Sequence, residues 1–465
     1  MKREQKGLKM RILSVITMLA ILFAGLTPTD AYARTQWPAL SSIEAEGGIL
    51  VDAATGTVLF AKNEDQQFYP ASITKILTAL LVIENCDNLD EEFAFSHRAV
   101  YDVEANSQNA GYDEGDVITV RDALYAMLLQ SANEVANGLA EYIGGSIEGF
   151  ADMMNEYAAS IGCTNSHFAN PSGLNNPDHY TTASDYAKIC IRAFDNETFR
   201  EIDGTTYYKL PASKRNPEGF TVYTHHGMLK KNNENYYPDA IGGKTGYTSL
   251  AGNTLVTCAE RDGLRLITVV LNGHQTHYSD TKAMLDFGFN NFKALKVRDY
   301  EQTYSDVYDV LDITSEGVSG VDVLTAQEDA SVVIPADAGF DDLTKTFAYS
   351  FDTSPAGTAP EGAVAKITYT YDGREVGTDY LTADLSVPEP EETQPETDEA
   401  QQQEPESKGS IGSTIVKVAV VIVLIAGIAA AVIYIVRRRR DNDMTVGPKN
   451  GGLGSVRGRS RRRRR

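Results

Sequence analysis

The chain has 465 residues, of which 42% are hydrophobic and 23% are charged, with 38 glycines and 16 prolines. This composition is typical of a globular protein and excludes a fully disordered, collagenous or coiled-coil chain. The 64 acidic and 42 basic residues give a net charge of −22, which disfavours a nucleic-acid-binding protein because such proteins carry basic surfaces.

The first 33 residues predict a secretory signal peptide. A basic stretch precedes an apolar run from Ile12 to Leu26, and Ala31-Tyr32-Ala33 supplies small residues for a cleavage site. An uncleaved membrane anchor is the alternative, but the run is short for a membrane span. We therefore expect cleavage near Ala33 and export of the rest of the chain.

Residues 34–296 combine predicted strands and helices. Ile49 to Phe60 is expected to form a β-hairpin, and a helix begins near Pro70. The run from Ile76 to Ile83 is apolar nearly all round, which predicts a central, buried helix. Further elements follow in chain order: a helix over 119–129 with Thr119 and Asp122 as a capping pair, a helix over 134–143, strands over 253–259 and 264–271, and a helix over 281–292.

Residues 297–387 change character and predict a small all-β domain. The clearest piece is Ala365 to Tyr371, where apolar or aromatic residues alternate with Lys and Thr. Asp372-Gly373 follows as a turn. This region contains no cluster of catalytic residue types.

Three segments of distinct composition end the chain. Residues 388–410 form an acidic, Pro-containing linker, and residues 411–436 are expected to cross the membrane once, since 418–436 contains no charge. Arg437 to Arg440 follow directly, so the C-terminus is expected in the cytoplasm and the catalytic part on the cell-wall side. The tail, 437–465, carries a net charge of +10 and is expected to attract anionic lipid, with an acidic partner as the alternative.

The four cysteines are widely spaced and include no C-x-x-C pair, which gives no support to a zinc or thioredoxin-like site. We expect free, buried thiols in a chain of this size. No H-E-x-x-H sequence occurs, so a zinc peptidase is disfavoured, and we interpret His179 as structural.

Ser72 and Lys75 stand three residues apart at the start of the buried helix, so their side chains share one face. A serine hydroxyl is a poor nucleophile unless a base takes its proton. A lysine amine can act as that base when burial or a nearby cation lowers its pKa. An ordinary surface Ser and Lys is the alternative, which the apolar run that follows disfavours.

Ser131-Ala132-Asn133 lies between two predicted helices. Ser131 could pass a proton to a leaving group, and the Asn133 amide can donate and accept hydrogen bonds to a peptide-like substrate. Taken alone, the three residues suit a helix N-cap by Ser131 better.

Lys244-Thr245-Gly246 follows Gly242-Gly243, ahead of the predicted strand pair. Lys244 and Thr245 suit a carboxylate, and Gly246 permits close approach of a substrate backbone. A glycine-rich turn with an exposed lysine is the alternative. A phosphate-binding loop is rejected because its first glycine position is Pro238.

The three motifs in this order resemble the penicillin-recognising serine enzymes. Their contexts, Pro70 to Lys75, Phe168 to Leu174 and Gly243 to Thr248, resemble those of the low-molecular-weight D-alanyl-D-alanine carboxypeptidases. The resemblance covers residues 38–295 and implies an α/β (α+β) catalytic domain of the serine β-lactamase/transpeptidase type. The region that follows resembles the C-terminal β-domain of that family less specifically.

The resemblance implies that Ser72 attacks the bond between the two D-alanines of a peptidoglycan stem peptide, with Lys75 as base and Ser131 as proton relay. Asn133, Lys244, Thr245 and Gly246 would bind substrate, with Lys244 and Thr245 on the terminal carboxylate. The backbone N–H groups of Ser72 and Tyr247 would form the oxyanion hole. β-Lactams would acylate Ser72, and neither metal nor cofactor is needed.

Three alternatives stay open. A D,D-endopeptidase of the same fold has the same motifs. A class A β-lactamase uses a glutamate in an E-x-x-L-N segment, which does not occur between Asn133 and Lys244. A non-catalytic wall-binding protein is disfavoured because a binding protein has no need of Lys75.

Overall fold

The computed structural model of the protein describes residues 36–301, 304, 307, 324–350, 359, 360 and 362–383. The predicted signal peptide (1–33), linker (388–410), membrane helix (411–436) and tail (437–465) lie outside these described residues. Within the described helices, none combines the length and the apolar character that crossing a bilayer requires.

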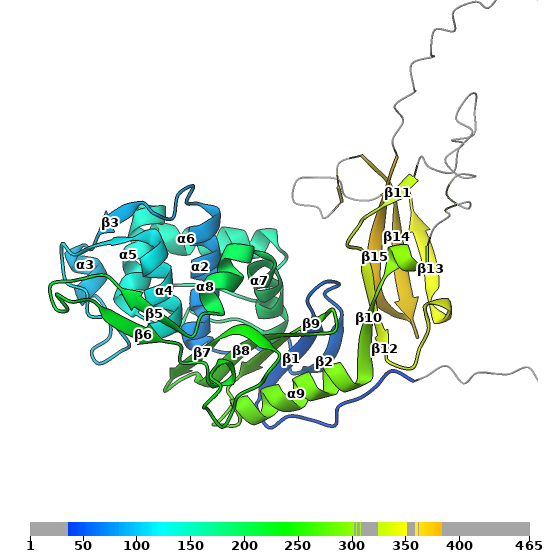
Figure 1. The fold of residues 1–465 in the computed structure, drawn as a ribbon, viewed down its shortest axis with the longest axis horizontal. Helices are drawn as coiled ribbons and strands as arrows, with labels where there is room; N and C mark the ends of the chain where they lie inside the picture. Colours follow the sequence, from blue (N-terminus) through cyan, green and yellow to red (C-terminus); the bar gives the residue numbers. More distant parts are fainter. Residues whose placement is uncertain are drawn as a thin grey trace, which may run out of the picture. The chain divides into compact units, whose positions relative to one another are not determined.

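A five-stranded antiparallel sheet forms the centre of the described region, in the order β2-β1-β9-β8-β7 (Figure 1). The first strand pairs with β9, so segments more than 200 residues apart lie side by side. The predicted hairpin and strand pair are confirmed as β1–β2 and β8–β9. The five strands are β1 (Gly47–Asp52), β2 (Val58–Lys62), β7 (Ala240–Thr248), β8 (Gly252–Arg261) and β9 (Leu264–Leu271).

Helices cover both faces of this sheet because its strands are apolar on both sides. Ile49 and Val51 of β1 pack into one hydrophobic cluster with most of the helices, whereas Leu50 packs into a second cluster with Met284 of α9 (His277–Asn291). Figure 1 shows α9 on one side of the sheet and the other helices on the opposite side. The helices of the larger cluster are α2 (Lys75–Glu84), α3 (His97–Tyr101), α4 (Val120–Gln130), α5 (Asn133–Gly144), α6 (Ile147–Ser160), α7 (Ala183–Asp195) and α8 (Glu197–Asp203).

The predicted central helix is confirmed as α2, whose residues from Lys75 to Val82 are all buried. It follows a 3-10 turn, η1 (Ala71–Thr74). The predicted cap of α4 is confirmed as well: Thr119 Oγ1 accepts a hydrogen bond from the N–H of Asp122 at 3.1 Å. These local signals therefore set the two helices that flank the candidate site.

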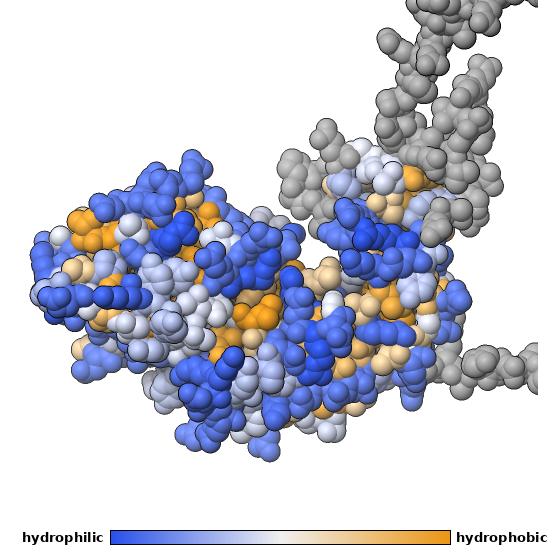
Figure 2. Space-filling model, in the orientation of Figure 1, coloured by the Kyte–Doolittle hydropathy of each residue, from blue (hydrophilic) through white to orange (hydrophobic). Residues whose placement is uncertain are grey.

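Two short hairpins and one further 3-10 turn lie outside the main sheet. They are β3 (Glu92–Ala94) with β4 (Val117–Thr119), β5 (Tyr207–Leu210) with β6 (Phe220–Tyr223), and η2 (Gly227–Leu229). On the face seen in Figure 2, hydrophilic residues cover most of the described surface, and apolar residues form separate patches.

The C-terminal described residues form a small all-β region. A four-stranded sheet has the order β11-β15-β14-β13. Alternation along β14 is as predicted, since Ala365, Ile367, Tyr369 and Tyr371 are buried. The strands of the sheet are β11 (Leu324–Ala326), β13 (Thr344–Ala348), β14 (Ala363–Tyr371) and β15 (Arg374–Ala383).

One strand pair connects this β-region with the rest of the fold. β10 (Phe292–Lys296) follows α9 directly and pairs with β12 (Ser331–Pro335), and Val333 packs into the hydrophobic cluster of α9. The described residues thus form an α+β fold in which the β-region shares a core cluster with the main sheet. The predicted boundary between the two domains at residue 296 lies at the end of β10 and stays a prediction.

Candidate active site

The turn that carries Ser72 is held from two sides. Ala71 has a left-handed backbone, with φ of 53°, and Thr254 of β8 donates its hydroxyl hydrogen to the carbonyl oxygen of Pro70 at 2.8 Å. On the other side, Gly173 approaches so closely that a Cβ there would lie 1.9 Å from the carbonyl oxygen of Ala71. The Ser72 hydroxyl therefore sits on a turn whose position is fixed by packing.

Lys75 is fully buried at the first position of α2. Its Nζ lies 2.6 Å from the carbonyl oxygen of Ser172, 2.7 Å from Oδ1 of Asn133 and 3.3 Å from Oγ of Ser72. Burial, and then the positive charge of Lys244, lower the pKa of Lys75 well below its usual value, whereas Glu134 raises it.

These contacts suit a neutral amine. A neutral amine has two N–H donors and one lone pair, and the two shortest contacts of Lys75 are to oxygens that only accept. In the neutral form, which the lowered pKa of Lys75 favours, the lone pair is free to accept from the Ser72 hydroxyl at 3.3 Å. The arrangement can therefore activate a serine nucleophile by removing its proton.

The carbonyl of Ser172 was not identified from the sequence. Asn170 accepts hydrogen bonds at Oδ1 from the N–H groups of Ser172 and Gly173, at 3.2 and 2.8 Å, and so folds the turn that presents this carbonyl to Lys75. The Asn-Pro-Ser-Gly sequence was a usable turn signal. His179, which was interpreted as structural, is buried and contacts Oγ1 of Thr74 at 2.8 Å through Nε2.

Ser131 ends α4 in a left-handed conformation, with φ of 60°. Its Oγ is buried and has no hydrogen-bond partner among the described residues, so the hydroxyl is not engaged by another group of the fold. The alternative that Ser131 is the N-cap of the next helix is wrong, because the N-cap of α5 is Ala132 and makes no side-chain hydrogen bond. Asn133 is the first residue of α5, rather than part of a loop, which is how its amide is directed at Lys75.

Lys244, Thr245 and Gly246 lie on β7, an edge strand of the main sheet, and the glycine-rich turn considered from the sequence is wrong. Lys244 is buried rather than exposed, and burial lowers its pKa to about 8 while Asp203 opposes the shift. Its Nζ donates to the carbonyl oxygen of Thr245 at 3.0 Å.

The glycine at 246 brings β7 against the nucleophile. A Cβ there would lie 2.3 Å from Oγ1 of Thr254 and 2.9 Å from the backbone nitrogen of Ser72. Tyr247 follows and is 68% exposed. The Ser72 turn and the backbone just before Tyr247 are thus adjacent, and the assignment of their N–H groups to an oxyanion hole stays a prediction.

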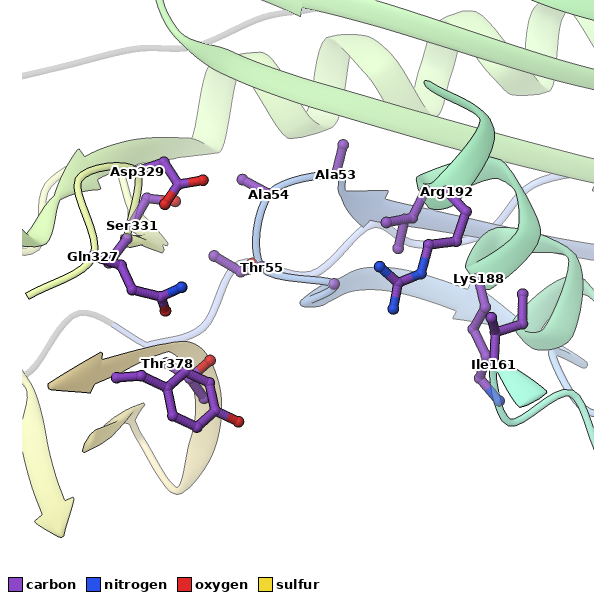
Figure 3. Close-up of a pocket in the computed structure, with 14 residues that line it drawn as sticks. Ala53, Ala54, Thr55, Ile161, Lys188, Arg192, Gln327, Asp329, Ser331 and Thr378 are labelled. Carbon is purple, nitrogen blue, oxygen red and sulfur yellow. The ribbon is translucent and has the colours of Figure 1, made fainter. Parts of the chain in front are cut away.

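A separate cavity of about 390 Å³ lies away from these residues (Figure 3). The figure shows Thr55, on the β1–β2 turn, in the middle of the lining residues. Arg192 and Lys188 of α7 lie on one side of it, and Gln327 and Asp329 lie on the other. None of the motif residues lines it. Among the described residues, no group of three His, Cys, Asp or Glu side chains is arranged to hold a metal ion, and all four cysteines are free.

Comparisons with known proteins agree in one family. The family described as D-alanyl-D-alanine carboxypeptidase matches residues 33–275. The D-alanyl-D-alanine carboxypeptidase DacF of Bacillus subtilis is 28% identical over 343 residues, which are 72% of this chain and 84% of that protein. The D-alanyl-D-alanine carboxypeptidase DacB2 of Mycobacterium tuberculosis is 33% identical over a region that covers 53% of this chain and 82% of that protein. The crystal structure of the Streptomyces K15 DD-transpeptidase superposes with a TM-score of 0.51 at 31% identity, covering 54% of this chain and all of that one.

Proposed function

The chain belongs to the D-alanyl-D-alanine carboxypeptidase family, and we propose that it cleaves its substrate through an acyl-enzyme formed on Ser72. It is a serine-type D-alanyl-D-alanine carboxypeptidase of peptidoglycan metabolism. Its substrates are peptidoglycan stem peptides, and β-lactams are its inhibitors.

In the proposed mechanism, the lone pair of Lys75 takes the hydroxyl proton as Ser72 Oγ attacks the carbonyl carbon between the two D-alanines. The N–H groups of Ser72 and Tyr247 stabilise the negative charge on the carbonyl oxygen. Ser131 then gives its hydroxyl proton to the departing amine and takes up the proton held by Lys75, so the C–N bond breaks, D-alanine leaves and Lys75 is neutral again. Water hydrolyses the ester on Ser72 and restores the hydroxyl.

Substrate binding is assigned to the two sides of the cleft. Asn133 hydrogen-bonds the peptide amide, and Lys244 with Thr245 binds the terminal carboxylate. Gly246 leaves room for the substrate backbone along the edge of β7. The terminal carboxylate is what distinguishes a carboxypeptidase substrate from a peptide cut internally, so Lys244 selects the chain end.

One observation carries this proposal: Nζ of buried Lys75 has Ser72 Oγ at 3.3 Å and two oxygens that can only accept at 2.6 and 2.7 Å. A structural lysine has no need of a serine hydroxyl at this position. Purified protein should form a covalent adduct with a fluorescent penicillin. Ser72→Ala should abolish the adduct and Ser160→Ala, at the exposed end of α6, should not; an unlabelled wild type would refute serine acylation.

We also propose that the enzyme works outside the cell membrane, held by one C-terminal span. The support is in the sequence: the charge-free stretch at 418–436 followed by Arg437 to Arg440, and the predicted signal peptide at 1–33. The acidic linker would separate the enzyme from the bilayer, and the basic tail would contact anionic lipid. Protease digestion of intact cells should remove the catalytic part and leave an epitope placed on the tail protected; digestion of that epitope would refute the orientation.

A further inference from the structure

A buried carboxylate lies directly behind the strand that carries Lys244. Asp203 ends α8 and is 2% exposed, and its Oδ2 accepts a hydrogen bond from the backbone N–H of Gly243. The contact is close: a Cβ on Gly242 would lie 2.7 Å from that same oxygen. The carboxylate therefore packs against the backbone one and two residues before Lys244.

The backbone at this point has an irregular shape that needs support. The pairing of β7 with β8 shifts register between Ala240 and Gly242, and Gly243 has φ of 146°. A Cβ on Gly243 would lie 2.1 Å from the carbonyl oxygen of Val256, so only glycine fits. Asp203 provides the acceptor for the N–H of this residue, and so fixes the strand just ahead of the lysine.

The charge of Asp203 also acts on Lys244. Burial lowers the pKa of Lys244 to about 8, and the negative charge of Asp203 opposes that shift. In turn, burial raises the pKa of Asp203 to about 7, which its hydrogen bond from Gly243 and the charge of Lys244 oppose. A buried lysine binds a carboxylate well only while protonated, because the neutral amine has no charge to offer.

The other titratable groups that face Lys244 do not supply a negative charge. Lys75 of α2 is a base, and burial lowers the pKa of His226, just before η2, to about 4, with the charge of Lys244 contributing. His226 is therefore neutral at pH 7, and His225 beside it is exposed and has no negative form in this range. Within the described residues, Asp203 is the group that favours the charged form of Lys244.

We propose that Asp203 is a positioning residue for the terminal carboxylate of the substrate: its ionised side chain fixes β7 through the N–H of Gly243 and keeps Lys244 protonated. This inference rests on the proposed function, because the carboxylate concerned is that of the terminal D-alanine. Asp203 does not itself touch substrate; it acts through Lys244.

The test compares Asp203→Asn with wild type in the full-length protein, over a pH range from neutral to alkaline. The asparagine oxygen can still accept from Gly243, so the substitution removes the charge and retains the hydrogen bond. The probe is the second-order rate constant for acylation of Ser72 by benzylpenicillin, which carries a carboxylate, and by its methyl ester, which does not. Since an opposite charge nearby shifts a pKa by roughly one to three units, the alkaline midpoint for benzylpenicillin should fall by at least about one unit.

The matched control is Glu201→Gln, which removes one exposed negative charge from the same helix and should leave the midpoint in place. The methyl ester should show the same pH dependence in all three proteins. A second substitution, Asp203→Ser, gives a smaller side chain without charge and should also lower the midpoint if Asp203→Asn does not fold.

An unchanged midpoint in a folded Asp203 variant would overturn the inference. An equal fall of the midpoint for the methyl ester would overturn it as well, because Asp203 would then act on the acylation chemistry and not on carboxylate binding. Failure of the wild type to react with either compound would instead refute the proposed function, so the two failures are distinguishable.

Discussion

The two buried lysines of the site, Lys75 on α2 and Lys244 on β7, have different surroundings. Nζ of Lys75 contacts neutral oxygens, and burial and the charge of Lys244 lower its pKa well below the usual value although the charge of Glu134 opposes them. Lys244 is equally buried, but the carboxylate of Asp203 lies behind its strand and opposes the effect of burial. Burial thus favours loss of the proton from both amines, and the neighbouring charge determines which one keeps it.

The supports of the two lysines differ as well. Lys75 begins a helix that is buried on all sides, and its position follows from the central core. Lys244 lies on an edge strand, where glycines at 242, 243 and 246 allow the neighbouring segments to come close. The base is therefore held by core packing, whereas the carboxylate-binding group is held by backbone contacts that only glycine permits.

The largest expected loss of activity follows substitution of Lys75. Lys75→Met keeps the length and apolar character of the side chain and removes the base, so acylation of Ser72 by penicillin should slow by roughly 10²- to 10⁴-fold. Stopped-flow measurement of the acylation rate checks this. Lys209→Met, an exposed position on β5, should react at the wild-type rate. A rate near wild type in Lys75→Met would show that the serine is activated by another group.

Lys244→Met should reduce activity nearly as much as Lys75→Met, but through KM and not through the rate of acylation. Loss of a buried, charge-assisted contact costs about 2–5 kcal/mol, which should raise KM for peptides ending in a free carboxylate. Acylation by the methyl ester of penicillin should change little. If Lys244→Met slowed the reaction with benzylpenicillin and with its methyl ester equally, Lys244 would not act by binding the carboxylate, and the two lysines would not have different roles.

Gly246→Ala tests the close approach of β7 to the nucleophile turn. The added methyl group would lie 2.3 Å from Oγ1 of Thr254 and 2.9 Å from the backbone nitrogen of Ser72. Over-packing of this kind costs roughly 1–3 kcal/mol, and thermal unfolding together with the acylation rate should show the loss. Gly339→Ala is the control, since the nearest atom to its Cβ is 3.7 Å away. A fully active Gly246→Ala would contradict the contact.

The smallest expected effect comes from the support of the Ser72 turn. Thr254→Val keeps the shape of the side chain but removes the hydrogen bond to the carbonyl of Pro70, at a cost of about 1 kcal/mol in the free energy of unfolding. Urea unfolding measures it, with exposed Thr221→Val as the control. An unchanged stability would mean that β8 does not hold the turn through this bond.

Local patterns in the sequence were sufficient to predict elements that form because of their own side chains. The all-round apolar run gave α2, and the pairing of Thr119 with Asp122 gave the start of α4. The strand β7 was not predicted, because Gly-Gly-Lys-Thr-Gly has neither alternation nor β-propensity. It is a strand because β8 pairs with it along its length, and such tertiary pairing overrides local preference.

The sequence predicted the residues of the candidate site whose side chains stand at characteristic spacings. It did not predict the residues that join the site through contacts between distant parts of the chain. Ser172 acts through its carbonyl, which the identity of its side chain does not reveal. Asp203 looks like any acidic residue at the end of a short helix, and only folding brings it against β7. Neither contact could be read from spacing along the chain.

The most direct test of the account is the protonation state of the two buried lysines. Lysine labelled with ¹³C at Cε, observed by NMR in full-length protein at pH 7, reports whether each amine is charged, and Lys75→Met and Lys244→Met assign the two signals. The account predicts a neutral amine for Lys75 and an ammonium for Lys244 in the same sample. Two ammonium signals would contradict it, because a protonated Lys75 has no lone pair with which to take the proton of Ser72.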